Sequence, residues 1–358
     1  MAVMCKVWTE WEEFICQSKK VREYMLNIGQ CGEFKIFMPE EEIIPGCKLR
    51  NERALEINRR FLQTPGAADA FQLPITGTFV YAHPPDYAGN PTLNWEKREW
   101  GEVFQRLKKR GMDTVVFQAS VWNELGEVYY RSAAFRSFRS WNVVEPMLEA
   151  ARENGLVVFL GGYGSVSGWN LSPDDSSAAR EVERQTACLS ELHEYHELFD
   201  GIYYSPETAF QGKRDFNREK NLNRIYREYF GRVKEMAPEK KLLMSPASIY
   251  YPGQRGEFTE SWMAILDDVP LDILAPQDSI GCGCCTLEEQ PEMWSLWSRI
   301  AREKQIPLWA NIELFERREF GGSAPFTAAS AERIAAQCGN VSPYVEKCIC
   351  WEALSFSL

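Results

Sequence analysis

Histidine is scarce in this chain, with three in 358 residues, and no long apolar run interrupts the sequence. Histidine is the commonest side-chain ligand of protein-bound metals, so its scarcity argues against a metal site. A membrane-spanning helix needs about 20 consecutive apolar residues. We therefore expect no metal, no other cofactor and no membrane as partner.

Basic residues are also fewer than acidic ones. The 40 Lys and Arg against 51 Asp and Glu give a formal net charge of −11. Nucleic acids and anionic membrane surfaces select basic patches, so neither is expected as a partner. The oligomeric state is left open by the sequence.

Residues 1–10 lack the charged and apolar regions of a signal peptide. The eleven cysteines are odd in number, and some of them, such as Cys188, Cys348 and Cys350, lie inside expected helices or strands. A disulfide framework is typical of much smaller secreted chains. We therefore expect reduced thiols and a cytoplasmic location.

Short apolar runs alternate with amphipathic stretches along most of the chain. Continuous apolar strands indicate burial on both faces, as in a parallel sheet covered by helices. Eight such strands predict an α/β fold of the (β/α)8 type, the TIM barrel, whereas an open doubly wound sheet is the alternative. The expected strands are 75–80, 114–120, 156–161, 201–205, 241–245, 271–275, 307–312 and 347–351. The amphipathic stretches include 95–110, 143–154, 178–198, 222–236 and 288–304.

The first 70 residues precede the first expected strand and contain two helical patterns, at about 9–27 and 51–63. Seven residues follow the last strand, which leaves no room for an eighth outer helix. We therefore predict that residues 1–70 are an N-terminal extension packed on the barrel, supplying the missing helix, and that residues 71–358 are the catalytic barrel. A separate small domain is the alternative, although about 70 residues would support one only marginally.

Two glutamates lie at the carboxyl ends of apolar runs. Glu207 follows the fourth strand in Gly-Ile-Tyr-Tyr-Ser-Pro-Glu, and Glu313 ends the seventh in Pro-Leu-Trp-Ala-Asn-Ile-Glu. Catalytic residues of a (β/α)8 barrel come from the C-terminal ends of different strands, and two carboxyl groups facing one cleft are the minimum machinery for glycoside hydrolysis. For either residue alone, a solvated or ion-paired rim carboxylate is the alternative. We predict that Glu207 and Glu313 form a catalytic pair.

Other polar and aromatic residues near the strand ends are candidates for contact with a carbohydrate. Gln277 and Asp278 follow the sixth strand and Glu352 ends the eighth. Aromatic faces stack on the C–H faces of sugar rings, although ordinary packing is the alternative for any one ring. The predicted substrate-binding residues are His83, Gln118, Trp122, Tyr163, Tyr251, Gln277, Asp278, Trp309, Asn311 and Glu352.

The densest cysteine cluster is Cys282-Gly-Cys284-Cys285. It has no CxxC pair, and no second pair follows at the spacing of zinc ligands. We therefore favour a structural or incidental role over a metal site, and the role of Cys282, Cys284 and Cys285 is left open by the sequence.

Several motifs resemble an uncharacterised TIM-barrel family that is grouped with the glycoside-hydrolase barrels. The resemblance covers residues 75–352. Its motifs are Ile75-Thr-Gly-Thr-Phe, Asn94-Trp95 with Trp100, Gly111-Met-Asp-Thr-Val, Tyr204-Ser-Pro-Glu, Leu274-Ala-Pro-Gln-Asp and Leu308-Trp-Ala-Asn-Ile-Glu-Leu-Phe-Glu.

In the large clan of retaining glycosidase barrels, the acid/base follows strand four and the nucleophile ends strand seven. By position, the resemblance implies that Glu207 is the acid/base and Glu313 the nucleophile. One departure is Pro206, because that clan usually has asparagine immediately before the acid/base. This difference concerns the recognition of the sugar 2-hydroxyl.

The sequence therefore favours a glycoside hydrolase that cleaves a small glycoside or oligosaccharide with two glutamates. In a retaining enzyme the carboxyl groups lie about 5–5.5 Å apart, and in an inverting one about 6.5–9.5 Å. Two alternatives stay open: a non-catalytic carbohydrate-binding barrel, and a metal-dependent sugar isomerase or epimerase. The identity of the sugar is not determined.

Overall fold

The computed structural model describes residues 34–35, 47–66, 72–83, 92–165, 173–317 and 325–356. Within these ranges, eight parallel strands form one sheet in the order β11-β10-β9-β7-β3-β2-β15-β12. The strands are β2 (Ile75–Val80), β3 (Thr114–Phe117), β7 (Val157–Gly161), β9 (Gly201–Tyr204), β10 (Lys241–Met244), β11 (Ile273–Leu274), β12 (Trp309–Glu313) and β15 (Lys347–Trp351). All eight match expected strands.

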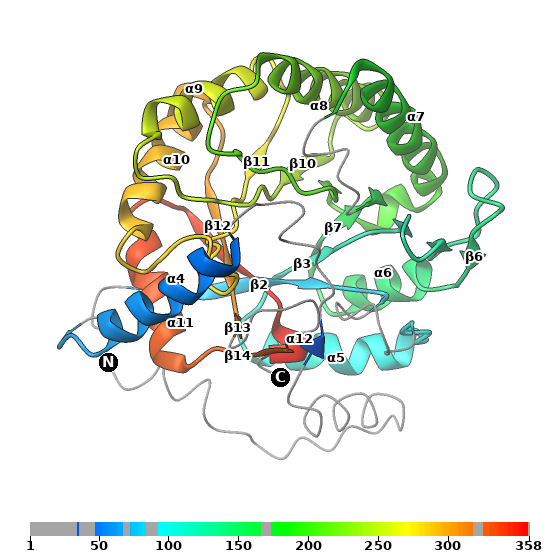
Figure 1. Ribbon diagram of the computed structural model, residues 1–358. Coiled ribbons are helices and arrows are strands. Elements are labelled where there is room, and N and C mark those ends of the chain that lie inside the picture. Colours follow the sequence, from blue (N-terminus) through cyan, green and yellow to red (C-terminus); the bar gives the residue numbers. More distant parts are fainter. Residues whose placement is uncertain are drawn as a thin grey trace.

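The two ends of this sheet meet. Parallel bridges join Leu274 to Leu308 and Gln277 to Asn311, between the segments of β11 and β12. The backbone N–H of Asn311 also donates to the carbonyl of Pro276 at 2.9 Å. Sheet closure and the surrounding helices, visible in Figure 1, make the fold a (β/α)8 barrel, as predicted.

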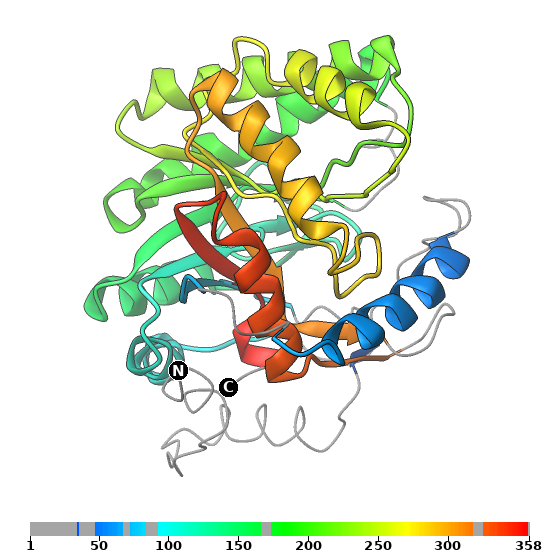
Figure 2. The ribbon, with the colours of Figure 1, turned by 90° about the vertical axis from the view of Figure 1, so that its left-hand side faces the viewer.

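Helices surround the strands on the outside (Figures 1 and 2). They are α4 (Cys47–Leu62), α5 (Lys97–Lys109), α6 (Val144–Glu153), α7 (Asp175–Leu192), the 3-10 helix η2 (His193–Leu198), α8 (Phe216–Met236), α9 (Arg255–Ile265), α10 (Gln290–Lys304), α11 (Ala331–Val341) and α12 (Ala353–Phe356). Local signals set their ends. Glu96 and Glu99 form a capping box at α5, and Gly111 (φ +83°) accommodates the turn after it. None of these helices is long and apolar enough to cross a membrane.

The core has two layers, inside and outside the sheet. Alternate residues of a strand point to opposite faces, so each strand contributes to both. The larger layer packs strands against the helices and includes Leu274, Ile312 and Cys350. The interior layer consists of Phe79, Tyr81, Val116, Phe159, Tyr203, Leu243, Ile273, Ala275 and Ile349. Side chains fill the barrel, and the ligand-binding end must lie above them.

Two small sheets extend the loops. The first joins β4 (Val121–Trp122), β5 (Glu127–Val128), β6 (Arg139–Ser140) and β8 (Tyr163–Gly164). The second joins β13 (Phe315–Arg317) to β14 (Pro325–Ala328), and β14 pairs antiparallel with β1 (Phe34–Lys35). The N-terminal extension thus pairs with the hairpin that follows β12.

The extension also contributes α4, which lies beside α11 (Figure 2). Ala54 and Asn58 of α4 are 2% and 5% exposed, and the Asn58 Oδ1 accepts the backbone N–H of Leu287 at 2.7 Å. α4 therefore adds a helix to the shell beside α11. The short α12 follows the end of β15 and contacts β2 and β14. The helical pattern expected at 9–27 lies outside the described residues.

Replacing Asn58 with alanine tests whether α4 is part of the folded barrel. The change leaves the buried N–H of Leu287 without its acceptor, which costs about 1–3 kcal/mol of unfolding free energy. Urea denaturation of the full chain measures this loss. Arg59→Ala, on the exposed face of α4, is the control and should change stability by less than about 0.5 kcal/mol. Equal effects of the two changes would show that α4 is not packed cooperatively on the barrel.

Candidate active site

Glu207 lies three residues after the end of β9, at the C-terminal mouth of the barrel. Its side chain is open to solvent, although protein atoms surround the carboxyl group closely. The partial loss of hydration raises the pKa of Glu207, and a hydrogen bond with Gln277 opposes this rise. A solvent-accessible carboxyl group with a raised pKa is suited to donating a proton near neutral pH.

A tyrosine also lies near Glu207. The Tyr203 phenol, on β9, is 1% exposed and hydrogen-bonds Gln118. Burial and the nearby charge of Glu207 raise the pKa of Tyr203 well above its usual value, so this phenol keeps its proton. Glu207 thus has Gln277 as a hydrogen-bond partner and Tyr203 as a neighbour, and Gln118 is linked to it through Tyr203.

The segment that follows Glu207 is fastened to helices. The Arg218 Nη2 donates to the carbonyl of Ala209 at 2.5 Å, and the hydroxyl groups of Thr208 and Tyr226 are 2.7 Å apart. Both Arg218 and Tyr226 belong to α8 and are buried. These contacts fix the backbone immediately after Glu207.

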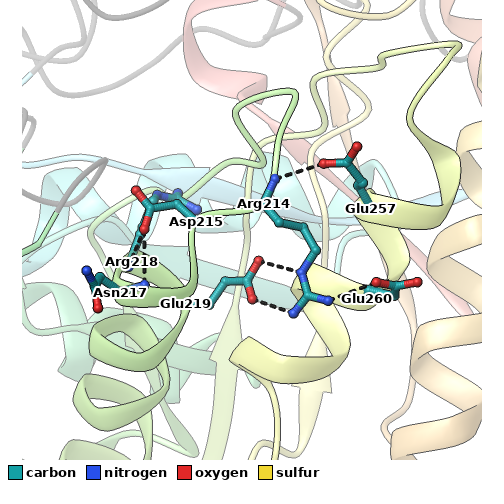
Figure 3. Close-up of polar contacts among 7 residues, drawn as sticks. All are labelled: Arg214, Asp215, Asn217, Arg218, Glu219, Glu257 and Glu260. Atoms are coloured by element: carbon teal, nitrogen blue, oxygen red, sulfur yellow. Dashed lines mark hydrogen bonds and ion pairs between the residues drawn. The ribbon is translucent and has the colours of Figure 1, made fainter.

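Arg214 forms a second fastening, shown in Figure 3. Its guanidinium binds both carboxylate oxygens of Glu219, at 3.1 and 2.7 Å, and one oxygen of Glu260 at 2.8 Å. Its backbone N–H donates to Glu257 at 3.0 Å. Asp215 caps the first turn of α8, accepting the backbone N–H groups of Asn217 and Arg218. The loop that carries Glu207 is therefore tied to both α8 and α9.

Glu313 ends β12 on the interior face, but it is enclosed. It is 3% exposed, and its Oε2 accepts the backbone N–H of Cys282 at 2.9 Å. The loop that covers it comes this close because residue 281 is glycine: a Cβ there would lie 2.9 Å from Oε2 of Glu313. Burial, with the nearby Cys282 and Asp278, raises the pKa of Glu313 well above its usual value. The protonated form of Glu313 is therefore favoured in this enclosed state.

Three of the predicted contact residues line a small cleft at the ends of β2 and β3. The cleft is lined by Tyr81, Ala82, His83, Gln118, Ala119, Trp122 and Tyr129. His83 is half-buried, whereas Gln118 and Trp122 are 6% and 5% exposed. These side chains come together as their positions after β2 and β3 predict.

Asn311 and Tyr251 lie on other parts of the barrel. Asn311, inside β12, is 1% exposed, and its amide donates to the Ser245 hydroxyl at 3.0 Å. Its Oδ1 is buried without a hydrogen-bond partner. Tyr251 is half-buried and packs edge-on against Phe210, with ring centroids 5.8 Å apart. Asn311 thus lies below the C-terminal mouth of the barrel, and Tyr251 lies at the outer side of this mouth.

Two of the predicted contacts are wrong because of where the chain runs. Tyr163 is 1% exposed, stacks on Phe135 and donates to the Asn123 side chain at 2.5 Å, so it belongs to the core of the small sheet. Trp309 is the first residue of β12, beside Lys347, the first residue of β15. A strand rises about 3.3 Å per residue, which places Trp309 about 13 Å below Glu313, at the amino end of the barrel.

Asp278 and Glu352 are also wrong as contacts, because they point outward. Asp278 is 1% exposed, and its carboxylate accepts hydrogen bonds from the backbone N–H of Glu313 and from the Gln337 amide. Glu352 is 2% exposed and accepts the backbone N–H groups of Leu354 and Ser355, each at 2.9 Å. Burial raises the pKa of Asp278 to about 6 and that of Glu352 to about 7. Both carboxyl groups belong to the framework.

Sequence reasoning missed some residues of the site. Tyr203 shares strand parity with the candidate Glu207, and this signal was available in the sequence. For the backbone N–H of Cys282, the only signal in the sequence was the glycine that precedes it. Arg333, whose Nη2 donates to the carbonyl of Glu313 at 2.9 Å, comes from α11 and gave no signal.

The described residues include no group of three or more His, Cys, Asp or Glu side chains arranged to hold a metal ion. Cys282, Cys284 and Cys285 are all free thiols in one loop. The residues at the mouth are carboxyl, amide, phenol and indole groups, which are suited to binding and protonating a polar organic substrate.

Comparison with known proteins places the chain in a family. The model of "Domain of unknown function (DUF4434)" matches residues 75–357. The chain belongs to this family. The match spans the whole barrel from β2 onward and leaves the N-terminal extension outside, as the sequence motifs indicated. Among curated proteins, no sequence matches.

Solved structures with the same fold include glycoside-hydrolase barrels. One is a candidate alpha-L-fucosidase from Bacteroides thetaiotaomicron VPI-5482, with a TM-score of 0.64 and 19% identity, covering 78% of this chain and 88% of the other. Another is the endo-1,4-beta-D-mannanase from Thermotoga petrophila RKU-1, with a TM-score of 0.50 and 12% identity, covering 78% and 88%. At such identities the likeness establishes the fold that these proteins share.

Proposed function

We propose that this protein is a glycoside hydrolase that cleaves a small glycoside or oligosaccharide by a two-glutamate, retaining mechanism. The observation that carries the proposal is the pair itself: Glu207 and Glu313 sit at the C-terminal ends of the fourth and seventh strands of one barrel. Barrel enzymes place catalytic groups at this end. Gln277 and Tyr203 supply hydrogen-bonding groups beside Glu207, and Gln118 hydrogen-bonds Tyr203.

In this proposal Glu207 is the acid/base. Its raised pKa keeps a proton available, which passes to the glycosidic oxygen as the bond to the anomeric carbon breaks. Glu313, once ionised, attacks the anomeric carbon and forms the covalent intermediate. The Cys282 N–H, 2.9 Å from Glu313 Oε2, favours the ionised form of that carboxyl group. Glu207 then removes a proton from the water that hydrolyses the intermediate.

A second candidate is a non-catalytic carbohydrate-binding barrel. The observation that favours it is the enclosure of Glu313, which is 3% exposed under the loop at Gly281 and Cys282. A binding barrel would keep the aromatic and amide groups without needing this carboxylate to reach a sugar. The metal-dependent isomerase receives no comparable support from the described residues.

A panel of aryl glycosides, assayed beside a binding measurement, separates the two candidates. The panel should include α-L-fucosides and β-mannosides, because those activities are in the names of the two solved structures. We expect release of the phenol from at least one member, with the same anomeric configuration in the first-formed sugar as in the substrate. Binding without release across the panel would favour the binding barrel. The carbohydrate is the one partner that we propose, and the proposed location, the cytoplasm, rests on the cysteine content alone.

A further inference from the structure

A group of buried polar side chains lies behind the end of β12, outside the barrel, and the proposed reaction leaves it unused. Asp278, in the loop after β11, is 1% exposed. Arg333 and Gln337, one turn apart on α11, are 2% and 0% exposed. Burying a charged side chain costs free energy unless the charge is paired. We therefore expect these side chains to have a role beyond filling space.

Hydrogen bonds connect Asp278 directly to Glu313. The Asp278 Oδ1 accepts the backbone N–H of Glu313 at 3.2 Å. The Oδ2 accepts the Gln337 amide at 2.5 Å, and the same amide reaches the carbonyl of Glu313 at 3.2 Å. The Arg333 Nη2 donates to the carbonyls of Glu313 and Phe315, at 2.9 and 2.5 Å. The backbone of Glu313 is therefore bound on both its N–H and its C=O side.

The charges of the group do not balance if both carboxyl groups are ionised. Arg333 contributes one positive charge, while Asp278 and Glu313 would contribute two negative charges, and all three side chains are at most 3% exposed. Burial raises the pKa of both carboxyl groups. The charges of Cys282 and Asp278 raise the pKa of Glu313 further, whereas the Arg333 charge lowers the pKa of both acids. One retained proton makes the three groups neutral.

We propose that Asp278 is a positioning residue for Glu313: it holds the end of β12 through the Glu313 N–H, and the two buried carboxyl groups, which lie in one cluster with Arg333, together retain a single proton. The effect of Asp278 on turnover rests on the proposed function. The single proton retained by Asp278 and Glu313 does not depend on that function. Other charged or titratable groups face the pair and act in the same field: Cys282 and Cys285 from the loop after β11, Arg333 and Cys338 from α11, and Glu316 from β13.

Asp278→Asn tests the proposal, because it keeps an oxygen that accepts the Glu313 N–H and removes the charge. Without the neighbouring negative charge, ionised Glu313 is stabilised and its pKa falls. The carbonyl band of the protonated Glu313 acid, identified as the infrared difference between the wild type and Glu313→Gln, should then disappear at a pH lower by about one unit or more. The acidic limb of the pH profile of kcat/KM should move in the same direction, while KM changes little.

Glu181→Gln is the matched control. Glu181 is a buried carboxyl on α7, 1% exposed, with a pKa of about 7 raised by burial. It does not belong to the group behind β12, so its loss should leave the Glu313 band unmoved. If Asp278→Asn leaves the band where it is in the wild type, the proposal is wrong, whatever the enzymatic activity.

Gln337→Met provides a second route if the asparagine variant does not fold. Without the Gln337 amide, ionised Asp278 loses its 2.5 Å donor, so the retained proton moves toward Asp278 and Glu313 ionises more readily. The band should again disappear at lower pH. An unchanged band in this variant would overturn the proposal. A moved band together with no hydrolysis of any aryl glycoside would refute the proposed function and leave the retained proton in place.

Discussion

Glu207→Ala is expected to lower kcat/KM for substrates with poor leaving groups by about 10²–10⁴-fold, the usual worth of general acid catalysis. Substrates with activated phenols need less help from a proton and should lose much less. The basic limb of the pH profile, which reports the loss of the acid's proton, should vanish in the variant. Rates measured across a series of aryl leaving groups check all three statements.

Azide separates the roles of the two glutamates. In Glu207→Ala it should attack the covalent intermediate from the side of the missing base, restore turnover and give a glycosyl azide of retained configuration. In Glu313→Ala, which should lose turnover of every substrate, azide would replace the missing carboxylate and give the inverted product. Product configuration by NMR reads out the difference.

The control for Glu207→Ala is its unfolding free energy. The side chain is open to solvent, so its removal should change the unfolding free energy by less than about 0.5 kcal/mol. Glu207→Gln, which keeps the shape and removes the acid, should lose activity in the same pattern. Wild-type rates in both alanine variants would mean that the pair is not catalytic. The opposite azide stereochemistry would exchange the two roles.

The barrel could be predicted from the sequence because its strands are short, apolar and buried on both faces. Their ends were harder to place. The expected strand at 114–120 stops at Phe117, since the chain there turns into β4 of a small sheet. α8 begins at Phe216, six residues before the expected 222, because Asp215 caps a first turn that is polar and carries no apolar stripe. Capping residues mark helix starts that hydrophobic periodicity misses.

Strand parity explains two of the four errors in the candidate site. Asp278 has the parity of Leu274, and Glu352 that of Cys350, whose side chains face the helices. Gln277 has the parity of Ile273 and Ala275, which fill the barrel interior. Counting alternation from the apolar core would have separated the inward Gln277 from the outward Asp278. Proximity to a strand end, without parity, does not place a side chain in the mouth.

Other features depend on parts of the chain that meet only in the fold. The enclosure of Glu313 comes from a loop about 30 residues earlier, where Gly281 permits close approach. The hydrogen bond to the Glu313 carbonyl comes from Arg333, about 20 residues later on α11. No local pattern in the sequence specifies that these segments converge on one residue. Hence the position of Glu313 at a strand end was predictable, and its enclosure was not.

Arg333→Met is expected to destabilise the protein by about 3–5 kcal/mol at neutral pH, the usual cost of leaving a buried charge without its partner. The arginine is 2% exposed and donates to two backbone carbonyls. Its loss leaves these carbonyls unpaired and Asp278 without compensating charge. Urea denaturation of the full chain at pH 8 measures the effect, and Arg224→Met, on the half-exposed pair with Glu228, should cost less than about 1 kcal/mol.

The pH dependence of this loss identifies charge as its cause. The pKa of Asp278 in the folded protein, about 6, lies above its ordinary value of 3.8, so its ionisation opposes folding as the pH rises through this interval. Without Arg333 the pKa of Asp278 rises further, so the free-energy cost of ionising Asp278 in the folded protein extends to higher pH. The difference between variant and wild type should therefore be larger at pH 8 than at pH 5, where Asp278 of the variant carries a proton. Arg333→Lys, which keeps the charge but not the paired donors, should show a loss that hardly varies with pH. A pH-independent loss in Arg333→Met would instead assign the whole effect to the two unpaired carbonyls.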